Sequence, residues 1–282
     1  MTTTTTSTPP PTFGPIPQHL WDKSPPLKDT SASGSLSVLN QYIRGPRGRA
    51  HGSWGYTILR TAYGPESDAL FAVALERLKS QVYWWGNHTG RFSAFGALCE
   101  EYRVDYDEPN QELFRRFYVE VIEDKEGLAH LDGGADEARF TALGEYFRRW
   151  VAGVETGWNP EKNPRFCVCL VLDSESVASL AALPEELPPL RCAVDLEEKR
   201  QFLGTGAGAW VWLLETDYIA DPELDEDEEL DEDDEYRGWM RMDVHYIQLS
   251  WFSRLGRGRS GKRRCFGHEE REQGSGIYWF AE

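Results

Sequence analysis

The feature that most constrains the fold is the run RFCVCLVLD at positions 165–173. Its side chains are apolar at alternate positions on both sides, so an extended segment with this sequence has no face that favours water. Such a strand needs neighbouring strands at its edges and packed helices over both faces. The run therefore predicts a central strand of a sheet that is covered on both sides.

Strand and helix patterns alternate around this run. Residues 54–63 and 114–124 are rich in β-branched and aromatic types, which favours strands. A helix is expected to begin at Gly64–Asp68, and Asp136 is the expected N-cap of a second helix. A third, short helix is expected from Ser174 and should stop before Pro184. The expected helix faces carry apolar residues at helical spacing, Phe71, Leu75, Leu78 and Val82 in the first helix and Phe140, Leu143, Phe147, Trp150 and Val154 in the second.

Further strands, without long helices between them, are expected at 190–195, 209–218, 239–252 and 276–281. Alternating strands and helices imply parallel crossover connections, whereas consecutive strands imply antiparallel pairing. The sequence therefore predicts an α+β domain with helices packed on a mixed β-sheet. A ferredoxin-like βαβ core is the leading topology.

The domain is expected to span residues 52–282, because residues 1–51 are rich in Thr, Pro, Ser and Gly and form a tail that we expect to be disordered. Two charged segments interrupt the domain. Residues 221–235 hold twelve of the carboxylates behind the net charge of −17, so without them the chain would carry −5. Residues 254–264 hold six cations among glycines. Both are expected to be disordered loops.

The chain has no run of about 20 apolar residues, so no membrane-spanning segment is predicted. It opens on a polar, Pro-rich stretch instead of a secretory signal, which favours a cytoplasmic or nuclear protein. Reduced thiols are then expected for all five cysteines, Cys99, Cys167, Cys169, Cys192 and Cys265. Cys167 and Cys169 would share one face of a strand, and we interpret them as buried core residues instead of zinc ligands.

The familiar catalytic signatures are absent, and no cofactor or metal is predicted. Gly204–Ala209 formally fits a dinucleotide-binding glycine pattern, but a strand instead of a helix is expected to follow it. The best catalytic candidates are Arg241, Asp243 and His245, which alternate along one expected strand. An Asp can orient a His as a general base, and an Arg can hold an anionic substrate. We favour another interpretation, in which these three residues form the solvent-exposed face of an ordinary strand whose opposite face is apolar.

The basic segment offers a possible electrostatic contact through Arg257, Arg259, Lys262, Arg263 and Arg264. These cations could bind phosphates, serve as a nuclear import signal or pair with the acidic segment. A pI of about 4.8 argues against nucleic acid as the main partner, because the overall field repels it.

The ordered part resembles a group of uncharacterised proteins from filamentous ascomycete fungi. The resemblance is carried by five stretches, Gly55–Tyr63, Glu66–Asp68, Phe147–Trp150, Arg165–Asp173 and Gly238–Met240. It implies a fungal origin and a shared fold, but no activity and no site residues.

Two functions from different classes follow. The first is a non-catalytic protein-binding module that uses its charged loops for salt-sensitive contacts with a partner protein. The alternative is a small-molecule enzyme, or an accessory protein of fungal metabolism, with a pocket near Arg241, Asp243 and His245.

Overall fold

A computed structural model describes residues 54–92, 117–153, 164–187, 208–216, 238–244, 247, 268–270 and 277–280. The predicted tail 1–51, the strand at 190–195 and the charged segments 221–235 and 254–264 lie outside these residues. So do His245, Tyr246 and all five named cations of the basic segment.

The described strands form one seven-stranded mixed sheet in the order β2-β1-β3-β4-β5-β7-β6. Strand β1, which lies next to the edge strand β2, runs parallel to both of its neighbours, whereas β4 and β5 continue the sheet in antiparallel fashion. At the far edge β7 runs parallel to β5 and antiparallel to β6. The strands are β1 (Thr57–Arg60), β2 (Glu120–Ile122), β3 (Val168–Leu172), β4 (Trp210–Glu215), β5 (Trp239–Asp243), β6 (His268–Glu270) and β7 (Ile277–Phe280).

The predicted α+β class with a mixed sheet is confirmed, but the ferredoxin-like topology is wrong. A ferredoxin-like core splits its βαβ units, so that an antiparallel strand lies between the two parallel ones. Here β1 pairs directly with both β2 and β3. The sequence correctly predicted parallel crossover connections. The strand order, however, depends on the side of β1 on which each crossover places the next strand, and the local pattern of apolar residues does not specify that side.

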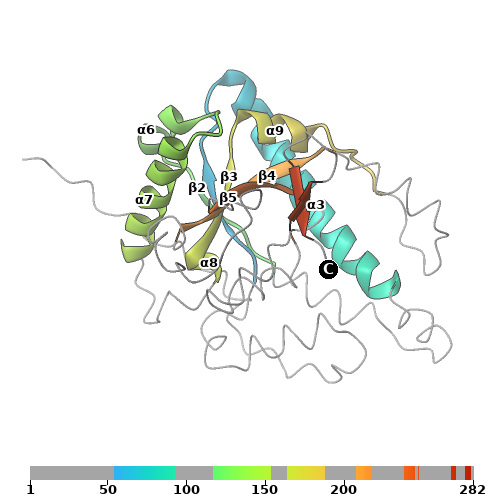
Figure 1. Ribbon diagram of the computed structural model, residues 1–282. Coiled ribbons are helices and arrows are strands. Elements are labelled where there is room, and N and C mark those ends of the chain that lie inside the picture. Colours follow the sequence, from blue (N-terminus) through green and yellow to red (C-terminus); the bar gives the residue numbers. More distant parts are fainter. Residues whose placement is uncertain are drawn as a thin grey trace, which may run out of the picture.

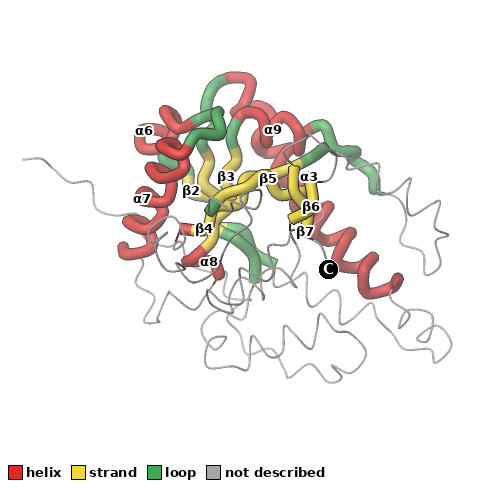
Figure 2. Tube along the Cα trace, viewed as in Figure 1, coloured by secondary structure: helices red, strands yellow, loops and turns green. Residues whose placement is uncertain are grey.

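Helices cover both faces of the sheet (Figure 1). The helix α3 and the shorter α9 pack on one face, and α6 and α7 pack on the other. Figure 2 shows the strands enclosed between these two groups of helices. The helical segments are α3 (Pro65–Phe92), α6 (Lys125–Leu128), the 3₁₀ turn η1 (Ala129–Leu131), α7 (Glu137–Gly153), α8 (Pro164–Cys167) and α9 (Ser174–Ala181).

The strand β3 is buried along its whole length, as its sequence predicts. Val168, Leu170 and Leu172 pack toward α3 and α9, and Cys169 and Val171 pack toward α7. Because each face has its own helical cover, apolar residues are favoured at every position. The prediction of a central strand covered on both sides is confirmed.

The helix starts also follow the predicted signals. Helix α3 begins at Pro65, where the fixed φ of proline suits the first turn. The side chain of Asp136 accepts a hydrogen bond from the Arg139 backbone N–H at 2.9 Å, so it caps α7 as expected. Helix α9 begins at Ser174, also as expected, and ends at Ala181.

Candidate functional site

The candidate site lies beyond the carboxyl ends of β1 and β3. Strand order reverses about β1, because the chain moves from β1 to β2 on one side and then to β3 on the other. In open α/β sheets, ligands bind at such a reversal point. The residues that follow the two strands are Thr61 and Ala62 after β1 and Asp173 and Ser174 after β3.

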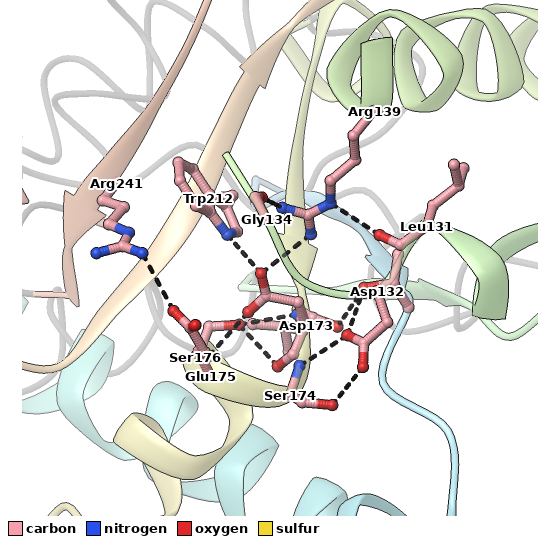
Figure 3. A network of polar contacts seen from close by, with 12 residues as sticks. Leu131, Asp132, Gly134, Arg139, Asp173, Ser174, Glu175, Ser176, Trp212 and Arg241 are labelled. Carbon is pink, nitrogen blue, oxygen red and sulfur yellow. Dashed lines mark hydrogen bonds and ion pairs between the residues drawn. The ribbon is translucent and has the colours of Figure 1, made fainter. Parts of the chain in front are cut away.

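Asp173 is the centre of this region and is only 1% exposed (Figure 3). Its Oδ1 accepts from the Ser176 backbone N–H at 2.9 Å, and the Ser176 Oγ accepts from the Asp173 N–H at 2.9 Å. This reciprocal pair is a capping box for α9. The other carboxylate oxygen of Asp173, Oδ2, accepts hydrogen bonds from Arg139 Nη2 at 3.0 Å and from the Trp212 indole Nε1 at 2.6 Å. One carboxylate therefore joins α9, α7 and β4.

Arg139 is the buried cation that balances Asp173. Its Nε donates to the Leu131 carbonyl oxygen at 2.8 Å and its Nη1 donates to the Gly134 carbonyl oxygen. The guanidinium also lies 4.9 Å from the ring centre of Phe140 and 5.7 Å from that of Trp212. Each of the three guanidinium nitrogens of Arg139 therefore donates a hydrogen bond to an acceptor inside the protein.

A second carboxylate, that of Asp132, covers the start of α9. Its Oδ1 accepts from the Ser174 backbone N–H at 2.9 Å and from the Thr61 Oγ1 at 3.4 Å, and its Oδ2 accepts from the Ser174 Oγ. The Ser174 Oγ also lies 3.3 Å from the Ser67 Oγ in the first turn of α3. Asp132 thus ties the segment before α7 to the ends of β1 and β3.

Arg60 organises the neighbouring edge of the region. It donates to the Ala62 carbonyl oxygen at 3.0 Å, to Glu123 at 3.1 Å and to Asp68. The guanidinium lies 4.7 Å and 4.1 Å from the ring centres of Tyr63 and Phe71, respectively. Burial raises the pKa of the Tyr63 phenol to about 12, against the opposing effect of Arg60. This phenol is therefore neutral and is no base near neutral pH.

The structure describes only two of the three predicted catalytic candidates. Arg241 and Asp243 do share one face of β5, as predicted, and His245 lies outside the described residues. The favoured interpretation, a solvated face, is wrong, because Asp243 is 1% exposed and Arg241 is half-buried. In the pairing of β5 with β4, Arg241 lies opposite Trp212 and Asp243 lies opposite Trp210. Residues that lie opposite each other point to the same side of a sheet, so Arg241 and Asp243 share the side of these tryptophans.

The cysteine prediction is confirmed in one respect and wrong in another. Cys167 and Cys169 are both buried, free thiols, and burial raises the pKa of Cys169 well above its usual value. They do not share a face, because Cys167 ends α8 and packs toward α3, whereas Cys169 lies in β3 and packs toward α7. The helical turn over Pro164–Cys167 occupies the start of the expected strand and breaks its alternation.

The glycine-rich run at 204–209 is described only at its last two residues. The strand β4 follows it directly, as predicted, in place of the helix that a dinucleotide site needs. Within the described ranges, no three or more His, Cys, Asp or Glu side chains are placed to hold a metal ion. In the same part of the chain, no helix combines the length and apolarity that crossing a membrane requires.

Sequence reasoning missed the bonds that join Asp173, Arg139 and Trp212. A signal existed for one of them, because Asp173 follows a buried strand and precedes Ser176 at the spacing of a capping box. Arg139 gave no such signal, since an arginine in the first turn of a helix usually faces solvent.

The chain matches no model of a known protein family, no curated protein and no solved structure. The resemblance to fungal proteins stays a prediction.

Proposed function

We propose that the protein is a non-catalytic protein-binding module. The observation that carries this proposal is the internal satisfaction of the charged groups beyond β1 and β3. Asp173 and Arg139 bond each other, and Asp132 bonds Ser174 and Thr61. A general base or nucleophile needs a lone pair that faces its substrate. These carboxylates instead direct their lone pairs at the protein's own N–H and O–H groups.

The connectivity of the sheet supports a binding role. Residues 221–235 join the paired strands β4 and β5, and residues 254–264 join β5 to β6. Since β7 pairs with both β5 and β6, the two charged segments are tethered to the same half of the sheet. Clustered charge of either sign speeds encounter with a complementary partner and makes binding sensitive to salt. The partner class proposed is a protein; we propose no role for nucleic acid.

The test neutralises each charged segment without shortening the chain. In one variant, all acids of 221–235 become Asn or Gln; in the other, the six cations of 254–264 become Gln. We expect a specific protein partner to be captured by the wild-type chain at low salt, and to be lost from one variant or both. Far-ultraviolet circular dichroism serves as the control for folding. Unchanged capture by both variants, or no specific partner at low salt, would contradict the proposal.

The alternative is a small-molecule enzyme that uses Arg241, Asp243 and His245. The half-buried guanidinium of Arg241 favours it, because such a group can hold an anionic substrate. Metabolite profiling of a deletion strain distinguishes the two: accumulation of one compound, restored to normal by the wild-type chain but not by Arg241→Gln, would replace the binding proposal. A cytoplasmic or nuclear location stays part of our proposal, and the reduced thiols of Cys167 and Cys169 are compatible with it.

A further inference from the structure

Arg241, the middle residue of β5, lies against a pair of tryptophans of β4. The Cζ of its guanidinium is 4.4 Å from the ring centre of Trp210 and 5.1 Å from that of Trp212. The two indole rings meet edge to face at 5.2 Å, and each is less than 7% exposed. The Trp212 Nε1–H donates a hydrogen bond to Asp173, which fixes the orientation of the indole ring (Figure 3). The guanidinium is therefore held against a rigid aromatic surface.

One edge of this guanidinium is only half used. Nε–H and Nη2–H point in the same direction and together fit the two oxygens of a carboxylate. Arg241 Nη2 donates to Glu175 Oε2 at 3.1 Å, but Nε is buried and has no hydrogen-bond acceptor among the described residues. A buried donor left without a partner is unfavourable, so the pairing with Glu175 leaves the guanidinium of Arg241 incompletely satisfied.

Glu175 is itself a weak occupant of this position. Its side chain is 62% exposed, against 29% for Arg241. Exposed ion pairs contribute little to stability, because water screens the attraction and ordering two long side chains costs entropy. A carboxylate from outside can therefore displace Glu175 at small cost.

We propose that Arg241, with Trp210 and Trp212 beneath it, is a docking point for an acidic side chain of a partner protein. The inference deepens the proposed function and rests on it, because it names the chemistry of the partner. Glu175 identifies the ligand class, since it is a side-chain carboxylate that reaches the same guanidinium from the first turn of a helix. When no partner is bound, Glu175 occupies the position.

The chain offers a matched control in Arg77. Arg77 also donates from Nη2 to an exposed glutamate, Glu185, at 3.2 Å, and its Nε is likewise buried with no acceptor among the residues described. Among the described residues, no aromatic ring lies against the guanidinium of Arg77. The two arginines thus differ chiefly in the tryptophan pair.

The experiment measures binding of a fluorescent Glu-rich peptide to the full-length protein by anisotropy, with a Gln-rich peptide of equal length for comparison. We expect Arg241→Gln to weaken the Glu-rich peptide about tenfold, as loss of a charge-assisted pair should. Glu175→Gln removes the internal competitor and should tighten binding several-fold. Arg77→Gln should leave the affinity unchanged. In nuclear magnetic resonance spectra, the Arg241 Nε–H signal should shift when the Glu-rich peptide is added.

Three results would overturn the inference. The first is equal binding of the Glu-rich peptide to wild type and Arg241→Gln, and the second is equal weakening by Arg77→Gln. The third is saturation of Arg241 by inorganic phosphate with no binding of either peptide, which would make the site a small-anion site. None of these results bears on the charged segments 221–235 and 254–264, so the proposed function would stand or fall by its own test.

Discussion

At the scale of single residues, a buried ion pair joins three elements of the molecule. The side chains of Asp173 and Arg139 are 1% and 3% exposed, and each forms hydrogen bonds with groups from more than one element. Buried pairs of this kind add little over apolar packing, but removing one partner leaves an uncompensated charge in the interior. The pair therefore fixes how α7, α9 and β4 meet.

Truncation of Asp173 tests this account. We expect Asp173→Ala to lower the free energy of unfolding by about 3–5 kcal/mol, because Arg139 would stay buried without its counter-charge. Urea denaturation followed by circular dichroism measures the loss. Glu175→Gln is the control, since the side chain of Glu175 is 62% exposed and should change stability by less than about 0.5 kcal/mol. A loss below about 1 kcal/mol for Asp173→Ala would contradict the role given to the pair.

The sequence predicted the role of some of these residues but not of others. Asp136 could be identified as a helix cap, because capping depends on residues three positions apart. Arg139 could not be recognised as a buried cation, because its partner Asp173 lies 34 residues away. Asp243 was wrongly expected to face solvent, because its burial depends on the register of β5 against β4, a distant segment of the chain.

At the scale of elements, the approach of β1 to β2 depends on a glycine. Gly55 has φ of +128°, and a Cβ built on it would lie 2.2 Å from the Tyr118 carbonyl oxygen. The Tyr118 backbone N–H donates to the Trp54 carbonyl oxygen at 2.9 Å, so the two segments are bonded at this point. Any side chain at position 55 would push them apart.

A pair of glycine variants separates this contact from backbone strain. Gly64 has φ of +143° but no atom within 4 Å of a built Cβ, so Gly64→Ala should cost only the strain of about 1–3 kcal/mol. We expect Gly55→Ala to cost clearly more, because it adds a steric clash with main-chain atoms. Thermal unfolding of both variants gives the comparison. Equal losses would mean that β2 adjusts easily and that the contact is unimportant.

At the scale of the whole molecule, burial of tyrosines sets the behaviour at high pH. Burial raises the pKa of Tyr63 and of Tyr118 to about 12, and the Tyr118 hydroxyl also donates to Glu120 at 2.9 Å. The pKa of Tyr146 is raised as well, by burial and by its hydrogen bond to Asp124. The phenols of an unfolded chain ionise near pH 10.

We therefore expect the protein to lose stability as the pH rises from about 10 to about 12. Below this window both states keep these phenols protonated, so the free energy of unfolding does not depend on them. Within it, the unfolded chain releases protons that the folded chain retains, which favours unfolding. Urea midpoints measured across the window, with Tyr63→Phe as a comparison, check the sign. A midpoint that stays constant or rises, or a slope unaffected by Tyr63→Phe, would contradict the assignment.

The sequence by itself determined the layered α+β plan, because the period of apolar residues is a local property. The all-apolar run of β3 required cover on both faces, and the helical spacing in α3 and α7 supplied it. Only the tertiary structure decided the strand order, the opposite placement of Cys167 and Cys169, and the position of Arg241 on its tryptophans. Those features arise from contacts between residues far apart in the chain, and no local pattern specifies which distant segments meet.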